Sequence, residues 1–271
     1  MTSTFFQAVI KNSTVPIFAA FPSRGSNLTV LDFEHGLGAA EKDYEYLSTL
    51  ASSGQYVVIS SGAHDSTLAE TTTELSHAML DTLSWVFAQA NSNASFPLYQ
   101  RLSGRSVAGG HSMGGGATFI SVSAQPRTFM ATLTYAPCGY PNEVYPVLGR
   151  VHVPSMVLVA SKDCLCNGIP LTEFDRLNST CKWLADITDA SHCGFCKFNV
   201  DHDKVVCEAA ERVQCPFTRH LDSSVQQNIT LTISLVWLQY IASPSSETRS
   251  DLVDTLNIYQ KKGQITWKTN C

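Results

Sequence analysis

The segment over residues 105–124, RSVAGGHSMGGGATFISVSA, most strongly limits how this chain can fold. It places Gly110-His111-Ser112-Met113-Gly114 between a predicted strand over 105–110 and a run of small residues that favours a buried helix. Glycine two positions before and after Ser112 lets the backbone turn sharply from strand to helix, since a side chain would block that approach. The segment therefore predicts an exposed serine hydroxyl at the carboxyl end of a strand. The alternative is a glycine-rich turn with an incidental serine.

Apolar runs alternate with amphipathic ones along the rest of the chain. Short runs bounded by turn residues predict strands over 15–22, 28–33, 55–60, 105–110, 128–136, 153–161 and 183–190. Apolar residues at helical spacing predict helices over 71–90, with a capping box of Thr71 and Glu74, and over 223–242, with a box of Ser223 and Gln226. This alternation predicts an α/β fold with a mostly parallel central sheet and helices on both faces.

Composition and charge indicate the number of domains and exclude some classes of partner. The 271 residues contain 44% hydrophobic residues and no repeat, low-complexity block or linker, so we expect one domain over 1–271. A formal net charge of -5 offers no basic surface, so neither nucleic acid nor an anionic membrane is an expected partner. No apolar run reaches the roughly 18 residues of a transmembrane segment. We expect a monomer.

Cysteines and glycosylation signals favour the secretory route. Nine cysteines suit an oxidising compartment, and the odd number leaves at least one thiol outside the intrachain disulfides. Five Asn-x-Ser/Thr acceptors occur, at Asn12, Asn27, Asn93, Asn178 and Asn228. Because the first residues lack the basic and then apolar layout of a signal peptide, we expect the mature form of a secreted protein.

The two residues expected to bind an oxyanion contribute backbone N–H groups. Met113 follows the serine at the start of the predicted helix, where N–H groups and the helix dipole favour negative charge. His35-Gly36-Leu37-Gly38 follows the predicted strand over 28–33, so we assign the second donor to Leu37. The alternative for this loop is a plain glycine turn, and His35 is interpreted as structural.

A nucleophilic serine at such a turn requires a later acid and a still later histidine. Asp163 follows an apolar strand directly, at the strand end where sites of α/β sheets form, whereas Asp175, Asp186 and Asp189 are less well placed. His192 follows the predicted strand over 183–190, while His202 and His220 are interpreted as surface residues. We therefore expect His192 to act as general base for Ser112 and Asp163 to orient its ring.

Each of the two predicted catalytic loops carries a cysteine pair. Cys164 and Cys166 follow Asp163, and Cys193 and Cys196 follow His192. We expect a disulfide to tie the two loops together, and Cys207 and Cys215 to close a small loop of their own. Zinc binding and redox chemistry are the alternatives, but a C-x-C pair is a poor zinc knuckle, so we expect neither metal nor cofactor.

These motifs together resemble a known enzyme group. GHSMGGGAT, the HGLG loop, Asp163, His192 and VWLQYI in the last predicted helix are similar to the dienelactone-hydrolase-related branch of α/β-hydrolases. That branch includes cutinase-like hydrolases of polyethylene terephthalate and the chlorophyllases. The resemblance covers about residues 15–242. It implies an α/β-hydrolase fold and a serine carboxylesterase with an open cleft and no metal, acting on a small-molecule or polymeric ester.

The chain departs from these relatives at the expected cleft. Polyester hydrolases usually carry an aromatic residue and a tryptophan at the places that Leu37 and Cys138 occupy here, and chlorophyllases usually carry arginine in place of Met113. Cys138 and His111 are therefore the candidates for lining the acyl cleft, although His111 could instead pack against a neighbouring loop. A chlorophyllase-like or lipid esterase, or a non-catalytic binding module with this fold, are the competing functions.

Overall fold

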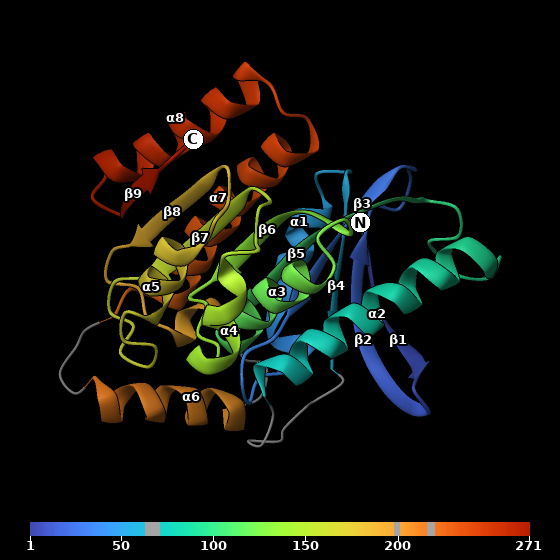
Figure 1. Ribbon diagram of the computed structural model, residues 1–271, viewed down its shortest axis with the longest axis horizontal. Coiled ribbons are helices and arrows are strands. Elements are labelled where there is room, and N and C mark those ends of the chain that lie inside the picture. The colour runs from blue at the N-terminus through green and yellow to red at the C-terminus, as the bar shows by residue number, and fades with distance from the viewer. Residues whose placement is uncertain (63–70, 198–200, 216–219) are drawn as a thin grey trace.

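A nine-stranded sheet organises the computed structural model, which describes residues 1–62, 71–197, 201–215 and 220–271. The strand order is β1-β2-β4-β3-β5-β6-β7-β8-β9 (Figure 1). The strands are β1 Thr2–Ile10, β2 Ser13–Phe21, β3 Leu28–Glu34, β4 Tyr56–Ser61, β5 Leu102–His111, β6 Phe129–Tyr135, β7 Ser155–Ala160, β8 Lys182–Ile187 and β9 Ile265–Thr269. Strands β3 to β8 run parallel, whereas β1, β2 and β9 pair antiparallel with their neighbours.

Helices cover both faces of this sheet. One face carries α2 Thr72–Ser92, α3 Met113–Ala124, α4 Pro141–Leu148 and α5 Ile169–Arg176, and the other carries α1 Ser48–Ala51, α7 Ser223–Ala242 and α8 Ser246–Lys261 (Figure 1). Helix α6 Asp201–Gln214 lies at the lower end of the sheet in that view. Two short 3₁₀ helices, η1 Glu41–Leu47 and η2 Cys193–Phe195, complete the elements.

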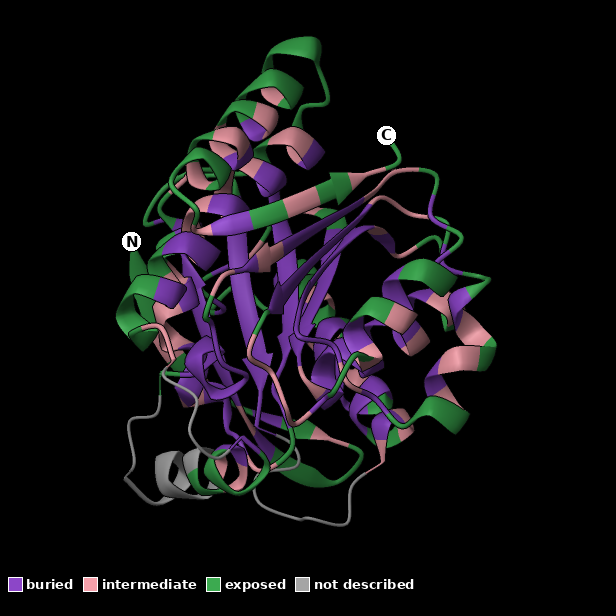
Figure 2. Ribbon diagram, turned by 90° about the vertical axis from the view of Figure 1, so that its left-hand side faces the viewer, coloured by how far each residue is buried: buried purple, intermediate pink, exposed green. Residues whose placement is uncertain are grey.

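Buried strands alternate their side chains between two cores. In β3, Leu28 and Val30 pack with the helices of one face, whereas Leu31 and Phe33 pack with those of the other. This period of two explains why every residue of β3 is buried, with side chains covered on both faces of the sheet (Figure 2). The predicted mostly parallel sheet with helices on both faces is confirmed.

The predicted N-terminal cap is present in α2 and absent from α7. Thr71 and Glu74 form the predicted capping box of α2, with Thr71 Oγ1 accepting from the Glu74 N–H at 3.1 Å. The predicted box of Ser223 and Gln226 in α7 is wrong, because Asp222 caps this helix by accepting from the Ser224 N–H at 2.9 Å. The Gln226 side chain instead bonds to the backbone of Ser191.

Several elements had no sequence prediction, among them β1, α8 and β9. Strand β1 forms a hairpin with β2, and Lys11 and Asn12 adopt positive φ angles of 48° and 67°, as the two residues of a tight hairpin turn do. Helix α8 and strand β9 form the end of the chain, with β9 antiparallel to β8. None of the helices within the described segments is long and apolar enough to cross a membrane.

Candidate active site

The sharp turn predicted around Ser112 joins β5 to α3. Ser112 adopts φ 55° and ψ -123°, a conformation that costs free energy for a residue with a side chain. A Cβ on Gly114 would collide with the carbonyl oxygens of Glu34 and His35, and one on Gly110 would collide with the Gly114 backbone. The two glycines of the motif are therefore required by close backbone approach, as the sequence predicts.

Backbone hydrogen bonds to the neighbouring strand hold this conformation. The Ser112 N–H donates to the Tyr135 carbonyl at 3.0 Å, and the Ser112 carbonyl accepts from the Cys138 N–H at 2.7 Å. Both partners lie at the end of β6 or just after it. The serine therefore stands at the carboxyl edge of the sheet, partly exposed, between β5 and β6.

The loop that carries Leu37 packs directly against this serine. Gly36 to Ala39 form a turn in which the Ala39 N–H donates to the Gly36 carbonyl at 3.1 Å, and Gly38 supplies the positive φ of 71°. A Cβ on Gly36 would lie 3.0 Å from Ser112 Cβ. Leu37 and Met113, the predicted oxyanion donors, line the same cavity as Ser112, and the Met113 N–H at the start of α3 has no acceptor within its helix.

Asp163 and His192 meet at the same edge of the sheet. Asp163 comes just after β7 and His192 soon after β8, and His192 Nδ1 lies 2.7 Å from Asp163 Oδ2. Their side chains are only 6% and 5% exposed, so water hardly weakens this pair. Asp163 Oδ1 also accepts from the Cys166 N–H at 3.0 Å, which fixes the carboxylate. His192 is close to this carboxylate through Nδ1, which leaves Nε2 for another partner.

The two groups shift each other's pKa in opposite directions. Burial lowers the pKa of His192, but the charge of Asp163 and its hydrogen bond, together with the charge of Glu211, raise it above the ordinary value. Burial raises the pKa of Asp163, but the charge and hydrogen bond of His192 and the backbone N–H groups of its own loop outweigh this and lower it. Asp163 is therefore ionised near neutral pH, and His192 binds its proton more tightly than a free imidazole does.

The other late histidines are placed elsewhere. His220, interpreted from sequence as a surface residue, is 23% exposed, and its Nδ1 lies 4.0 Å from Glu211 Oε2. His220 is therefore partly exposed, with its ring near Glu211 of α6. The side chain of His202 lies outside the described residues.

The disulfide network differs from the expected one. The four disulfides are Cys138–Cys166, Cys164–Cys215, Cys181–Cys271 and Cys193–Cys207. The expected direct bridge between the Asp163 and His192 loops, and the expected bridge between Cys207 and Cys215, are wrong. Cys207 of α6 bonds to the His192 loop and Cys215, just after α6, bonds to the Asp163 loop, so the covalent connection between the loops is indirect. Cys196 is the unpaired cysteine that the odd count requires, and it is buried.

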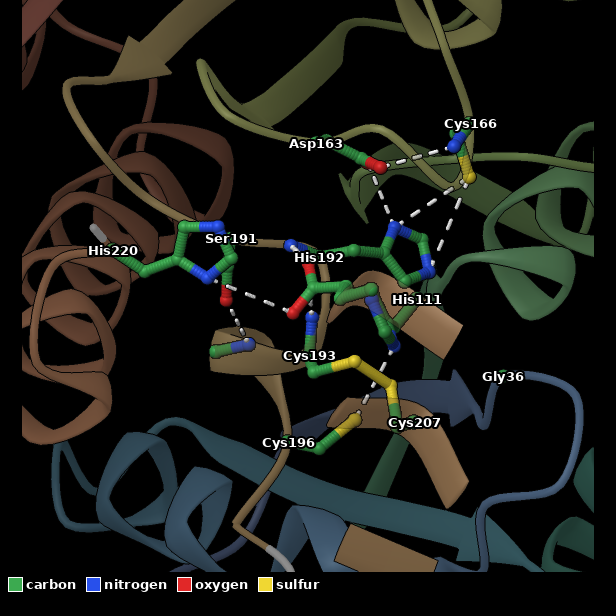
Figure 3. Close-up of a disulfide and its surroundings, with 12 residues drawn as sticks. Gly36, His111, Asp163, Cys166, Ser191, His192, Cys193, Cys196, Cys207 and His220 are labelled. Carbon is green, nitrogen blue, oxygen red and sulfur yellow. Dashed lines mark hydrogen bonds and ion pairs between the residues drawn. A yellow bond between two sulfur atoms is a disulfide. The ribbon is translucent and has the colours of Figure 1, made fainter. Parts of the chain in front are cut away.

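Asp163, Cys166 and His192 do not form a complete ligand set for a metal ion. Asp163, Cys166 and His192 offer ligand atoms that all lie within 4.8 Å of one another. However, Cys166 Sγ is bonded to Cys138 and has no thiolate to donate. The Sγ atom instead packs against the His192 ring, 3.5 Å from Nδ1 and 4.0 Å from Nε2 (Figure 3).

A cavity of about 330 Å³ opens beside Ser112, Met113 and His192. Its wall includes three apolar side chains, Leu37, Leu165 and Tyr140, and the disulfide of Cys138. Leu37 and Tyr140 are 40% and 41% exposed, so both side chains can contact an apolar ligand in this cavity. Cys207 and Ala210 of α6 close another side of the cavity.

His111 also lines this cavity and packs against its neighbours. Its Nδ1 lies 2.8 Å from the Tyr44 hydroxyl, and its ring centroid lies 4.6 Å from that of His192. Burial, together with the charge of His192, lowers the pKa of His111 well below the ordinary value, so this ring is neutral. The structure thus places His111 in both positions considered from the sequence, at the cavity wall and against the next loop.

Two polar residues organise this region: Tyr44, which the sequence did not single out, and Gln226, which was expected in a helix cap. The Tyr44 hydroxyl accepts from the Gly36 N–H at 3.1 Å, besides its contact with His111, and lies 3.3 Å from Cys196 Sγ. Gln226 of α7 accepts from the Ser191 N–H at 3.1 Å and donates to its carbonyl at 2.9 Å. Neither has a local sequence signal, because both act across long sequence separations.

Comparisons with known proteins agree with this architecture. A family model described as PET hydrolase-like matches residues 23–221. The crystal structure of a dienelactone hydrolase from Anabaena variabilis superposes with a TM-score of 0.57 at 18% identity, covering 78% of this chain and 96% of that chain. A comparison with curated proteins found no match. The predicted resemblance to this branch is confirmed, and the structural likeness supports the fold.

Proposed function

Since the chain belongs to the PET hydrolase-like family, whose model covers most of its length, we propose that it is a serine-dependent carboxylic ester hydrolase. The observation that carries this proposal is the pairing of Asp163 with His192 at 2.7 Å, at the rim of the cavity that also holds Ser112. Acid, histidine and serine come from three different strand ends, in the chain order of such hydrolases.

The tautomer of the neutral His192 ring determines which nitrogen can accept the Ser112 proton. Asp163 accepts from the Nδ1–H of the ring, so Nε2 of the neutral ring is the free base that takes the Ser112 proton as the hydroxyl attacks the ester carbonyl. Within the described residues, Ser112 Oγ makes no hydrogen bond with His192, so we expect this contact to tighten when substrate is bound. The alkoxide leaving group takes the proton from His192, and water then releases the acyl group by the same route.

Two backbone groups supply the charge stabilisation. We assign the oxyanion to the Met113 N–H at the start of α3 and the Leu37 N–H in the Gly36–Ala39 turn, because both residues line the cavity that holds Ser112. Because Gly36 packs within van der Waals contact of Ser112, the turn cannot move away from the serine without breaking this packing.

The cavity favours esters with an apolar acyl group. Leu37, Tyr140 and Leu165 provide an apolar wall, and a volume of about 330 Å³ lies at the small end of the range for ligand pockets. We therefore propose short to medium acyl or aryl esters as substrates, including chain ends of polyesters. Tyr140, two positions after Cys138, provides an aromatic surface near the place where the polyester hydrolases usually carry tryptophan.

We also propose that the protein works in an oxidising, secretory compartment. Four disulfides favour this location. The asparagines of the five glycosylation signals are all exposed, at Asn12, Asn27, Asn93, Asn178 and Asn228. A mass shift on treating the secreted protein with a glycosidase that cleaves N-linked glycans would test their occupancy.

The deciding experiment is hydrolysis of p-nitrophenyl butyrate by the wild type and by Ser112→Ala. We expect the variant to lose roughly 10⁴-fold or more in kcat and to lose labelling by a fluorophosphonate probe. Ser84→Ala, at an exposed serine of α2, is the matched control and should behave as the wild type. A folded wild type without turnover or labelling would contradict the proposal and favour a binding module.

The pH profile tests His192 separately. Since His192 must be neutral to act as base and its pKa is raised, kcat/KM should rise with pH along a limb centred above about 6.5 and then level off. Steady-state rates from about pH 5 to about pH 9 measure this limb. A flat profile with chemistry rate-limiting would contradict the assignment of His192.

A further inference from the structure

Helix α6 brings a second carboxylate to the His192 loop. Glu211 is 2% exposed, and its Oε1 accepts from the backbone N–H of His192 at 2.5 Å and of Cys193 at 3.3 Å. Asp163 contacts the imidazole ring from the opposite side of the residue. His192 is therefore held by two carboxylates, one through its ring and one through its backbone.

Burying the Glu211 carboxylate costs free energy that other interactions must offset. A carboxylate removed from water loses several kcal/mol of hydration, and its partners must return that free energy. Within the described residues, no Lys or Arg side chain pairs with the Glu211 carboxylate. Its contacts are two backbone N–H groups and the His220 ring, whose Nδ1 lies 4.0 Å from Oε2. Burial raises the pKa of Glu211 above its ordinary value, whereas the charges of His192 and His220 and the two backbone N–H groups favour its ionised form.

Covalent bonds fix Glu211 against the loop. Cys207 lies one helical turn before Glu211 on α6, and Cys215, directly after the helix ends at Gln214, donates its backbone N–H to the Glu211 carbonyl at 2.6 Å. Cys207 is bonded to Cys193, next to His192, and Cys215 is bonded to Cys164, next to Asp163. Figure 3 shows the Cys193–Cys207 bridge beneath the His192 ring and His220 at the left of the view. Two disulfides thus connect the α6 region to both predicted catalytic loops, and Glu211 lies between their cysteines in the sequence.

From this geometry we propose that Glu211 is a positioning residue for the hydrolytic reaction, which holds the His192 backbone and places a second negative charge near its ring. The inference rests on the proposed esterase function. The charged and titratable groups around His192 are Asp163 at its ring, Glu211 at its backbone and His111 at its face, with His220 beyond Glu211. A second cavity, of about 530 Å³, is lined by Glu211 together with Lys197, Arg212 and Asp222.

A negative charge near the ring favours the protonated imidazole, so it affects the pH dependence as well as the geometry. The charge of Glu211 raises the pKa of His192, in addition to the larger contribution of Asp163. Removing this charge should let His192 lose its proton at lower pH. A purely structural role for Glu211 would lower stability and leave the acid limb of the pH profile in place.

Glu211→Gln separates charge from hydrogen bonding, because the amide oxygen can still accept both N–H groups. For p-nitrophenyl butyrate hydrolysis we expect kcat of Glu211→Gln to stay within about threefold of the wild type, with the acid limb of kcat/KM moved to lower pH by several tenths of a unit. Glu211→Ala removes both functions and should lose about tenfold or more in kcat with little change in KM.

Glu143→Gln is the matched control. Glu143 Oε2 accepts from the Thr73 N–H at 2.8 Å near the start of α2, so this variant also removes a charge that accepts a backbone N–H, at another place. Its profile should match that of the wild type. An unshifted acid limb in Glu211→Gln would overturn the inference, as would failure of this near-isosteric variant to fold. If the wild type itself hydrolyses no ester, the proposed function fails, whereas an active wild type with an unshifted Glu211→Gln variant refutes this inference alone.

Discussion

The Ser112 half of the candidate site and the Asp163–His192 half are built by different means. Around Ser112, glycines at Gly110, Gly114 and Gly36 allow backbones to touch, and no cysteine lies within the turn. Around Asp163 and His192, three disulfides and a helix hold loops that contain little regular structure. The first half is held by close packing, and the second by covalent bonds.

This difference follows from where each half lies in the sheet. The serine turn sits between β5 and β6 in the middle of the sheet, where β3, β6 and α3 surround it. The His192 loop lies after β8, near the edge, with fewer strands to pack against. Crosslinks there replace the packing that a central position provides. The Cys138–Cys166 disulfide is the covalent link between the two halves.

The largest effect is expected from adding one carbon atom to the serine turn. Gly114→Ala places a Cβ against the backbone oxygens of Glu34 and His35, which cannot move aside as a side chain can. We expect a loss of about 3 kcal/mol or more in the free energy of unfolding, or no soluble protein. Gly149→Ala, where a Cβ meets nothing within 4 Å, is the control and should change stability by less than about 1 kcal/mol in urea unfolding. Equal stability of the two variants would contradict this packing argument.

A smaller effect is expected from removing one disulfide of the Asp163–His192 half. The double variant Cys193→Ser/Cys207→Ser frees the His192 loop from α6 and should lose about 2 to 4 kcal/mol in stability and about tenfold in kcat. Cys181→Ser/Cys271→Ser opens the bridge at the C-terminus, far from Ser112, and should lose stability while retaining kcat. Thermal unfolding and ester hydrolysis measure both. If the two double variants had the same kcat, the bridges would serve stability alone.

The smallest effect is expected at the contact between the halves. Tyr44→Phe removes the hydroxyl shared by Gly36, His111 and Cys196, leaving buried polar groups without this partner at a cost of about 1 to 3 kcal/mol. We expect a decrease of a few-fold in kcat as the turn next to Ser112 loosens. Tyr56→Phe removes a buried hydroxyl that donates to Leu238 and should lower stability only. The comparison is contradicted if Tyr56→Phe lowers kcat as much as Tyr44→Phe does.

Much of the fold could be predicted because its signals are local. Apolar runs of strand length located β2 to β8, and Thr71 with Glu74 located the start of α2. Strand β1 and strand β9 escaped prediction because both are antiparallel edge strands with one exposed face and few fully buried residues. The single domain over 1–271 and the monomeric state stay predictions.

The sequence alone determined the positions of Ser112, Asp163 and His192 as candidates, because steric limits at the glycine turn and strand ends in a parallel sheet are written in neighbouring residues. Only the tertiary structure decided which cysteines pair, since a disulfide depends on distances between loops that lie far apart in the chain. For the same reason it alone brought Tyr44, Gln226 and Glu211 to the site. Cys207, Glu211 and Cys215 are spaced four residues apart, but the residues that α6 faces depend on how the whole chain packs.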